Sequence, residues 1–195
     1  MPILHTVAVK SVNPGGRLHC GQSTTVRKNG EFGFLGEYIA GSHQIHVFEF
    51  RNGAAGNHPK TFMPVVIMQP EMQYDDSRKS LLKLKNWEIK PNTPFTCVPL
   101  TEGDKLQITS DALLKNDGQP TEDGDLVVEK CYTLENDTHQ LKLTADGTNA
   151  GVGANEVYYE IVKVKNAHKR PAKVAGDTSN PNYKLYTLEV KVKRA

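Results

Sequence analysis

The chain has 195 residues, of which 24 are basic and 22 acidic, so its formal net charge is +2. This length suffices to bury a core without disulfides or metals, and the balanced charge excludes electrostatic capture by nucleic acid or an anionic bilayer as the main binding force. The longest apolar stretch, residues 62–68, is interrupted by Pro64 and is too short to cross a membrane. The N-terminus has neither a basic start nor a long apolar segment, so we expect synthesis in the cytoplasm without a secretory signal.

Residues 1–30 are predicted to form an extended N-terminal arm. Val7 and Val9 alternate at its start, and a Pro-Gly-Gly turn and a polar stretch at residues 22–25 follow. The alternative is an ordinary edge strand with a loop, because the Asn29-Gly30 pair that ends the segment is also a strong hairpin signal. Both interpretations place extended backbone at the beginning of the chain.

The cysteines indicate reduced structural thiols. Cys20, Cys97 and Cys131 are odd in number and contain no CxxC pair, so neither a disulfide framework nor a zinc knuckle is predicted. Cys131 lies inside an expected strand, where a small hydrophobic side chain serves equally well. Cys20 lies in a Gly-containing segment, and if it is exposed it offers a cross-link to a neighbouring subunit.

Residues 31–90 are predicted to be an N-terminal β portion in which aromatic residues cluster. The cluster consists of Phe32, Phe34, Tyr38, Phe48 and Phe50, and it is either core or a set of interface anchors. Residues 51–60 read as a long loop, and residues 71–85 allow a short helix of one or two turns. Pro91 and Pro94 stop either kind of element, which predicts a boundary near residue 90.

Residues 91–195 read as a regular β portion. Apolar and polar residues alternate at 105–109, 140–144 and 186–193, which puts one face of each strand in a core and the other in water. Two acidic-Gly-Asp turns, at residues 102–104 and 123–125, are each predicted to lead into a strand. The expected fold is therefore all-β: a small β-barrel or β-sandwich with an extended N-terminal arm and at most one short helix.

No group of residues is predicted to carry out catalysis or to bind a metal or cofactor. His43 and His46 are three apart in an expected strand and point to opposite faces. His19 and Cys20 are adjacent, and adjacent side chains rarely face each other as a nucleophile and base must. The acidic run at residues 122–125 lacks the spaced ligands and distal glutamate of a calcium loop. Because no phosphate loop or hydrolase elbow occurs either, the chain is expected not to be an enzyme.

Several segments resemble the capsid cement, or decoration, proteins of tailed bacteriophages. They are the run at residues 95–104, the turn at residues 123–125, the strand at residues 141–143 and the closing segment at residues 183–190. This resemblance implies a small β-barrel or β-sandwich with an arm, which clamps neighbouring major capsid subunits after the shell expands. The implied partners are the major capsid protein and other copies of the chain on the lattice. The implied location is the capsid exterior of the virion, and no catalytic residue is implied.

On this interpretation the binding residues are expected in the arm and in the aromatic cluster. They are Val7, Val9 and Arg17 of the arm, followed by Phe32, Phe34, Tyr38, Phe48 and Phe50. Strand addition at a sheet edge gives affinity through backbone hydrogen bonds, and buried aromatic anchors add to it. Direct binding to nucleic acid, a membrane or a small-molecule substrate is not expected.

Two other functions stay open from the sequence. A phage tail or fibre component that recognises a cell surface needs the same β framework, with the loops at residues 146–155 and 166–182 as its binding face. A glycan hydrolase needs two carboxylates held across a cleft. Asp104 and Asp125 satisfy this requirement only if their two turns are neighbours.

Overall fold

The computed structural model of the protein describes residues 8–10, 19–39, 46–53, 63–68, 88–121, 123–168 and 185–195. The predicted all-β fold is confirmed, since strands dominate and the described helical elements are three 3-10 turns of three residues each. The strands are β1 (Ala8–Lys10), β2 (His19–Gln22), β3 (Phe32–Tyr38), β4 (Val47–Arg51), β5 (Met63–Ile67), β6 (Phe95–Pro99), β7 (Lys105–Thr109), β8 (Leu113–Leu114), β9 (Cys131–Leu134), β10 (Leu141–Leu143), β11 (Val157–His168) and β12 (Leu185–Arg194). The 3-10 turns are η1 (Ser110–Ala112), η2 (Asp123–Asp125) and η3 (Asn149–Gly151).

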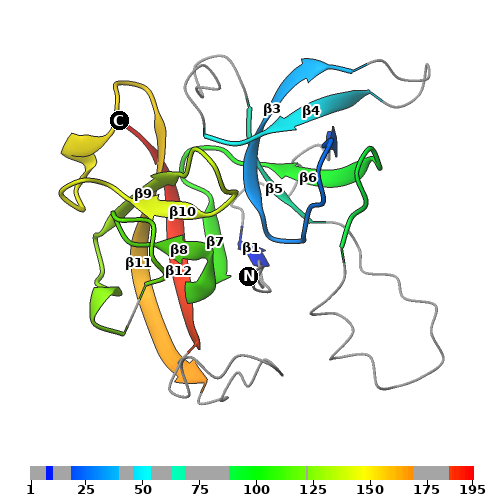
Figure 1. Cartoon of the computed structure of the whole chain (residues 1–195). Helices are drawn as coiled ribbons and strands as arrows, with labels where there is room; N and C mark the ends of the chain where they lie inside the picture. The colour runs from blue at the N-terminus through cyan, green and yellow to red at the C-terminus, as the bar shows by residue number, and fades with distance from the viewer. Residues whose placement is uncertain are drawn as a thin grey trace.

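Five strands from the first half of the chain close into a small barrel (Figure 1). Their order is β2-β4-β3-β5-β6, and β6 pairs back with β2, so the barrel has no open edge. β2 and β4 are parallel, and the other four pairs are antiparallel. The closing pair joins residues far apart in sequence, with Cys20 opposite Thr96.

Side chains fill the barrel interior, and glycines make room for its aromatic rings. The interior cluster consists of Leu35, Phe50, Val65, Ile67, Ile89, Phe95 and Cys97. A Cβ atom at Gly21 would lie 2.8 Å from the Phe95 ring, and one at Gly33 would lie 2.5 Å from the Phe50 ring. The rings therefore occupy space that exists only because these two positions carry no side chain.

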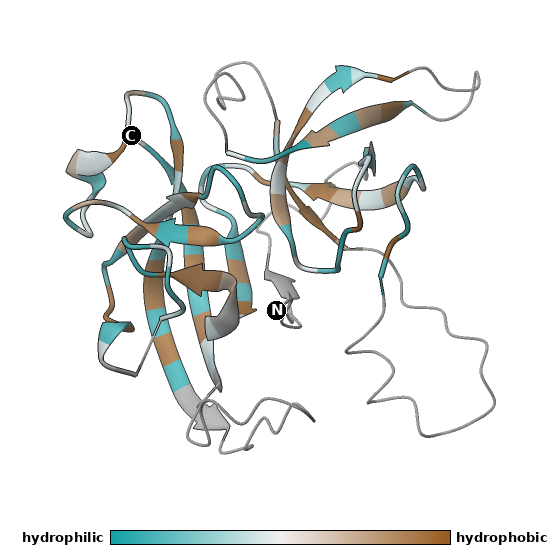
Figure 2. Ribbon diagram, viewed as in Figure 1, coloured by the Kyte–Doolittle hydropathy of each residue, from teal (hydrophilic) through white to brown (hydrophobic). Residues whose placement is uncertain are grey.

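Seven strands form a second, curled sheet in the order β1-β7-β12-β11-β9-β10-β8. The 12 residues of β11 and the 10 of β12 form its long central hairpin. The hydropathy bands along these two strands alternate (Figure 2), because successive side chains point to opposite faces. Register shifts in β11, the first between Ile161 and Lys163, mark bulges that bend the hairpin.

The barrel and the sheet share one hydrophobic core. Phe32, Phe34 and Val66 of the barrel belong to the same buried cluster as the inward residues of the sheet. The Phe32 ring meets the Tyr159 ring edge to face, with 5.2 Å between centroids. The Phe32 amide donates to the carbonyl of His139 at 3.0 Å, and the His139 ring lies 2.8 Å from the carbonyl of Phe32. The two halves are therefore joined by packing and by backbone hydrogen bonds.

The structure differs from the sequence-based expectation in where the arm ends. β1 pairs with β7 at the edge of the seven-stranded sheet, and β2 is a strand of the closed barrel. Residues 19–22 are thus a strand of the barrel, and residues 23–30 form bends and a turn that are hydrogen-bonded to Ile67 and Ile89, not an extended arm. The physical reason is that β2 supplies the strand that joins β4 to β6, and the barrel cannot close without it.

A boundary between the two β portions is expected near residue 90, but the chain passes from the barrel to the seven-stranded sheet only after Pro99. β6 completes the barrel with residues up to Pro99, and the seven-stranded sheet takes over from β7 onward. Pro91 and Pro94 precede β6 in a turn and loop within the barrel portion. The short helix expected at residues 71–85 lies outside the described residues.

The two acidic-Gly-Asp turns have different structures. Gly103 has a φ of 95° and leads directly into β7, as predicted. The second turn is the 3-10 turn η2. The prediction of a strand directly after it is wrong, because residues 126–130 form a loop and a turn. Val127 and Val128 are exposed there.

Candidate functional site: an exposed aromatic cluster on the barrel

Four rings gather on the outside end of the β3–β4 hairpin, and we call them the aromatic cluster: His19, Tyr38, His46 and Phe48. The Tyr38 ring lies 5.5 Å from the His46 ring and 6.2 Å from the Phe48 ring, centroid to centroid. The His19 ring meets the other side of Phe48 at 6.2 Å. The hairpin points away from the seven-stranded sheet (Figure 1), so the cluster lies at the far end of the barrel.

A bulge in β3 puts Tyr38 in this position. Leu35 lies opposite Phe50, and Tyr38 lies opposite Phe48, so β3 contains one residue more than β4 over the same length. Without the extra residue, Tyr38 would lie opposite Val47. β-bulges re-aim side chains in this way and are frequent beside binding sites.

Burial divides the predicted aromatic residues into two groups. Phe32, Phe34 and Phe50 are buried in the core. Tyr38 is 51% exposed, and Phe48 is only partly covered. Tyr38 and Phe48 are therefore the members of the predicted set that can contact another molecule, while the other three stabilise the fold.

His19 and His46 were not predicted as neighbours of these rings. From the sequence, His46 is a candidate only for a metal site and His19 only for a base, because periodicity alone does not reveal that β2 and β4 are parallel neighbours. Exposed Ile39 lies directly beside Tyr38 and donates its amide to the carbonyl of Val47 at 2.9 Å. Exposed Met63 begins β5 opposite Leu35 of the same strand as Tyr38. Ile39 and Met63 are thus two further exposed apolar residues of the strands that carry or adjoin Tyr38.

The structure describes one of the three predicted binding residues of the arm. Val9 lies in β1 opposite Leu106, at the edge of the seven-stranded sheet. Val7 and Arg17 lie outside the described residues. Among the described strands β1 has only β7 as a neighbour, and it lies at the end of the seven-stranded sheet.

The carboxylates considered for hydrolysis each have a structural partner. Asp104 is buried, and its carboxylate accepts hydrogen bonds from the amide and hydroxyl of Thr101 at 2.8 Å and 3.0 Å. Asp125 forms an ion pair with Lys115 at 3.3 Å. Among the described residues no three His, Cys, Asp or Glu side chains gather as metal ligands would.

The thiols are covered to different degrees. Cys97 and Cys131 are buried, and burial raises the pKa of both. Cys20 is partly exposed in β2, and burial also raises its pKa. Cys20 is therefore the accessible cysteine, but its thiol is not activated for nucleophilic attack.

Comparison of the chain with protein-family models, with curated proteins and with solved structures finds no match. No helix in the described part of the chain is long and apolar enough to span a membrane. The geometry of the surface is therefore the basis for the functional proposal that follows.

Proposed function

We propose that the protein is a non-enzymatic structural protein of a bacteriophage virion, which binds neighbouring major capsid subunits and cements the head. The observation that carries the proposal is the aromatic cluster at the projecting end of the β3–β4 hairpin. Clustered aromatic side chains with two rotatable bonds each are typical anchors of protein interfaces. The resemblance of the second half of the chain to cement proteins points in the same direction.

The edge of β1 that no described strand covers is the second contact in this proposal. A strand of a capsid subunit can add to β1 by backbone hydrogen bonds, which need no special side-chain chemistry. The aromatic cluster and the β1 edge belong to different layers of the molecule, so one copy can contact two subunits. Each contact can have a modest affinity, because sites that are fixed on a shell act at high effective concentration.

Co-sedimentation with expanded shells of the phage that encodes the chain tests this proposal. The wild-type protein should saturate the shells, and Tyr38→Ser should bind about tenfold more weakly, as expected for loss of an interface anchor. Val26→Ser is the matched control, since Val26 is also an exposed apolar residue of the barrel but lies outside the cluster. Equal binding of wild type and Tyr38→Ser would exclude the cluster as an anchor.

The position of β2 in the barrel limits which truncation can test the contribution of the arm to binding. Deletion of residues 1–30 would remove β2 and open the barrel, so loss of binding would be uninterpretable. Deletion of residues 1–7 leaves all described strands intact. If the arm contributes, this shorter deletion should weaken attachment without changing the melting temperature of the isolated protein.

The alternative is a tail or fibre component that recognises a cell surface, and the same cluster favours it. Exposed tyrosine and histidine rings are suited to stacking on sugar rings as well as to protein contacts. Binding to host cells, lost in Tyr38→Ser, together with no affinity for shells, would support this function instead. Hydrolysis of glycans is the third possibility, and unchanged turnover after Asp104→Asn and Asp125→Asn would eliminate the residues that suggested it.

A further inference from the structure

The charges of the second half of the chain are segregated along the sequence. Residues 115–156 contain nine acidic and three basic residues, whereas residues 157–195 contain nine basic and three acidic residues. The small net charge of the whole chain conceals these two opposite blocks. Such asymmetry indicates that different surfaces of the molecule attract different partners.

The described lysines of the basic block lie on one face of the seven-stranded sheet. Leu188, Val190 and Val192 of β12 are buried, so the residues between them point to the opposite face. This face, which we call the basic face, carries Lys105 of β7, Lys163 and Lys165 of β11, and Lys191 and Lys193 of β12. Lys105 lies directly opposite Lys191, and Lys10 of β1 occupies the next register position opposite Lys105.

The basic face is only partly neutralised. Lys105 pairs with Glu189 at 3.7 Å, and Lys193 pairs with Glu160 at 2.6 Å. Lys163 is exposed, and among the described residues neither it nor Lys191 has an ion-pair partner. Like charges directly opposite each other on neighbouring strands are destabilising. Glu160 lies opposite Lys191 and Glu189 lies opposite Lys163, so two glutamates offset part of the charge of this face. The face keeps an excess of lysines, which an external partner of opposite charge can neutralise.

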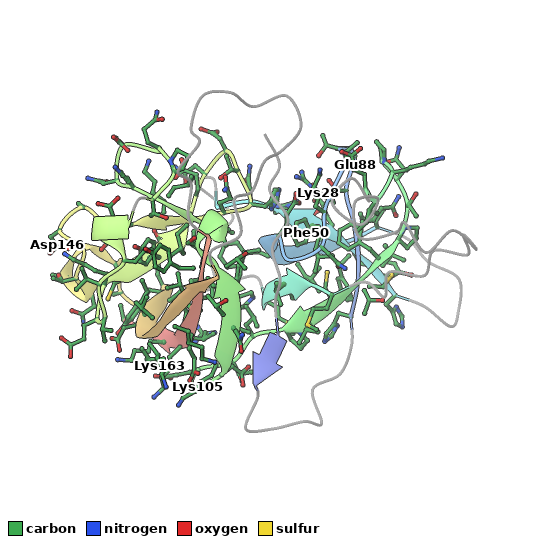
Figure 3. The ribbon with its side chains drawn as sticks, turned by 90° about the horizontal axis from the view of Figure 1, so that it is seen from below. Lys28, Phe50, Glu88, Lys105, Asp146 and Lys163 are labelled. Carbon is green, nitrogen blue, oxygen red and sulfur yellow. The ribbon has the colours of Figure 1, made fainter. Side chains whose placement is uncertain are left out.

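The described part of the acidic block lies in loops and turns, which we call the acidic loops: residues 115–121, 123–130, 135–138 and 145–148. Asp117, Glu129, Asp137 and Asp146 are exposed in them. Val127 and Val128, 49% and 46% exposed, lie directly before Glu129. Apolar side chains beside carboxylates are the composition of a protein-binding surface with a hydrophobic centre and a charged rim. Asp146 lies apart from Lys105 and Lys163 on the molecule (Figure 3).

We propose that the basic face of one copy binds the acidic loops of a second copy, head to tail. The chain itself carries the two complementary surfaces, and their opposite charge supplies steering and orientation. The aliphatic stems of the lysines can cover Val127 and Val128 while their ammonium groups reach the surrounding carboxylates.

A nucleic acid is a poorer occupant for the same face. Glu160 and Glu189 interrupt the lysines and repel a continuous row of phosphates, and among the described residues of the face no exposed aromatic ring is available to stack on bases. Discrete carboxylates on loops can be placed between the two glutamates. A second copy of the chain therefore fits the charge pattern better than a polyanion does.

The two contacting surfaces differ, so the contact is heterologous and leaves one free surface at each end. Such contacts produce rings if they close and open chains if they do not. This inference goes beyond the capsid proposal, and it also holds if that proposal fails. Its test uses the purified full chain without shells, so the two outcomes are independent.

A charge-swap experiment tests the proposal by sedimentation velocity of the full chain. The wild type should associate as its concentration rises, and high salt should weaken the association at least about tenfold because exposed charges are screened. The doubly reversed variants Lys163→Glu/Lys191→Glu and Asp117→Lys/Glu129→Lys should each remain monomeric. An equimolar mixture of the two should associate again, because the reversed face of one then matches the reversed loops of the other.

Lys90→Glu is the control, since Lys90 is an exposed lysine of the barrel portion outside both surfaces and its reversal should leave association unchanged. Circular dichroism of each variant verifies that it is folded. A wild type that stays monomeric at every concentration, or a mixture that does not associate, would overturn the proposal. Tight binding of duplex DNA by the monomeric wild type, lost in Lys163→Glu/Lys191→Glu, would also overturn it and assign the face to a polyanion.

Discussion

Replacement of His139 by alanine should destabilise the protein more than any surface substitution, because His139 joins the barrel to the sheet. Its imidazole Nδ1 lies 2.8 Å from the carbonyl oxygen of Phe32 and its ring stacks on Phe50 with 4.8 Å between centroids. The side chain is almost completely buried, with 6% exposure. Alanine would remove both interactions and leave a cavity between the two halves.

The expected cost follows from these contacts. A buried carbonyl that loses its hydrogen-bond partner costs about 1–3 kcal/mol. A lost ring stacking contact adds about 0.5–1.5 kcal/mol. We therefore expect His139→Ala to lower the free energy of unfolding by about 2–4 kcal/mol at neutral pH.

His139 should also make the stability depend on pH. The pKa of His139 is lowered from 6.5 to about 4, first by burial and second by the nearby Arg27 guanidinium, while the hydrogen bond to Phe32 offsets part of this lowering. The unfolded chain then binds a proton between pH 6.5 and pH 4 that the folded protein excludes. The stabilisation by neutral His139 is complete above pH 6.5 and is lost as the pH falls toward 4. The total loss corresponds to about 3 kcal/mol, of which about 2 kcal/mol is lost by about pH 5.

Urea unfolding of wild type, His139→Gln and His46→Gln, at a pH near 7.5 and near 5, measures both effects. The loss of stability on acidification should be about 2 kcal/mol smaller in His139→Gln than in wild type. His46→Gln should keep the wild-type pH dependence, because His46 is an exposed ring on the barrel and leaves His139 in place. Identical acid sensitivity of wild type and His139→Gln would refute the claim that a buried neutral histidine joins the two halves.

Three further predictions concern the core and the thiols. Gly33→Ala should destabilise the protein by about 1–3 kcal/mol in urea unfolding, because the new methyl group would lie 2.5 Å from the Phe50 ring. Gly124→Ala is the control and should have no effect, because a methyl group there would meet no described atom within 4 Å. Tyr132→Phe should leave the stability unchanged or raise it by up to about 1 kcal/mol, because the buried Tyr132 hydroxyl has no hydrogen-bond partner in the described structure. A melting temperature several degrees below that of the wild type would contradict this prediction. In a thiol titration of the native protein Cys20 should react first, because the other two cysteines are buried, and simultaneous reaction of all three would show that the barrel opens.

Local periodicity predicts much of the second half of the chain. The alternation at residues 105–109 corresponds to β7, and the alternation at residues 140–144 and 186–193 contains β10 and most of β12. In each case one face of the strand is buried and the other meets water, which is the condition under which a period of two appears in a sequence. The all-β class follows from these strands.

The barrel could not be predicted in the same way, because its closure depends on long-range pairs. β2 has few strongly hydrophobic residues, and its strand state is fixed by β4 and β6 on its two sides. The strand predicted after η2 is absent for the opposite reason: Leu126 to Val128 are strand-forming residues, but none of the described strands pairs with them. The aromatic residues near the start of the chain look alike in sequence, and only the structure shows that Phe50 lies in the barrel interior whereas Tyr38 is 51% exposed.

The most direct test of the proposed cementing role is the thermal stability of expanded shells with and without bound protein. If the protein bridges capsid subunits, shells saturated with wild type should disassemble at a higher temperature than bare shells, and shells incubated with Tyr38→Ser should behave like bare shells at the same protein concentration. Shells that bind the wild-type protein but disassemble at the temperature of bare shells would contradict a cementing function.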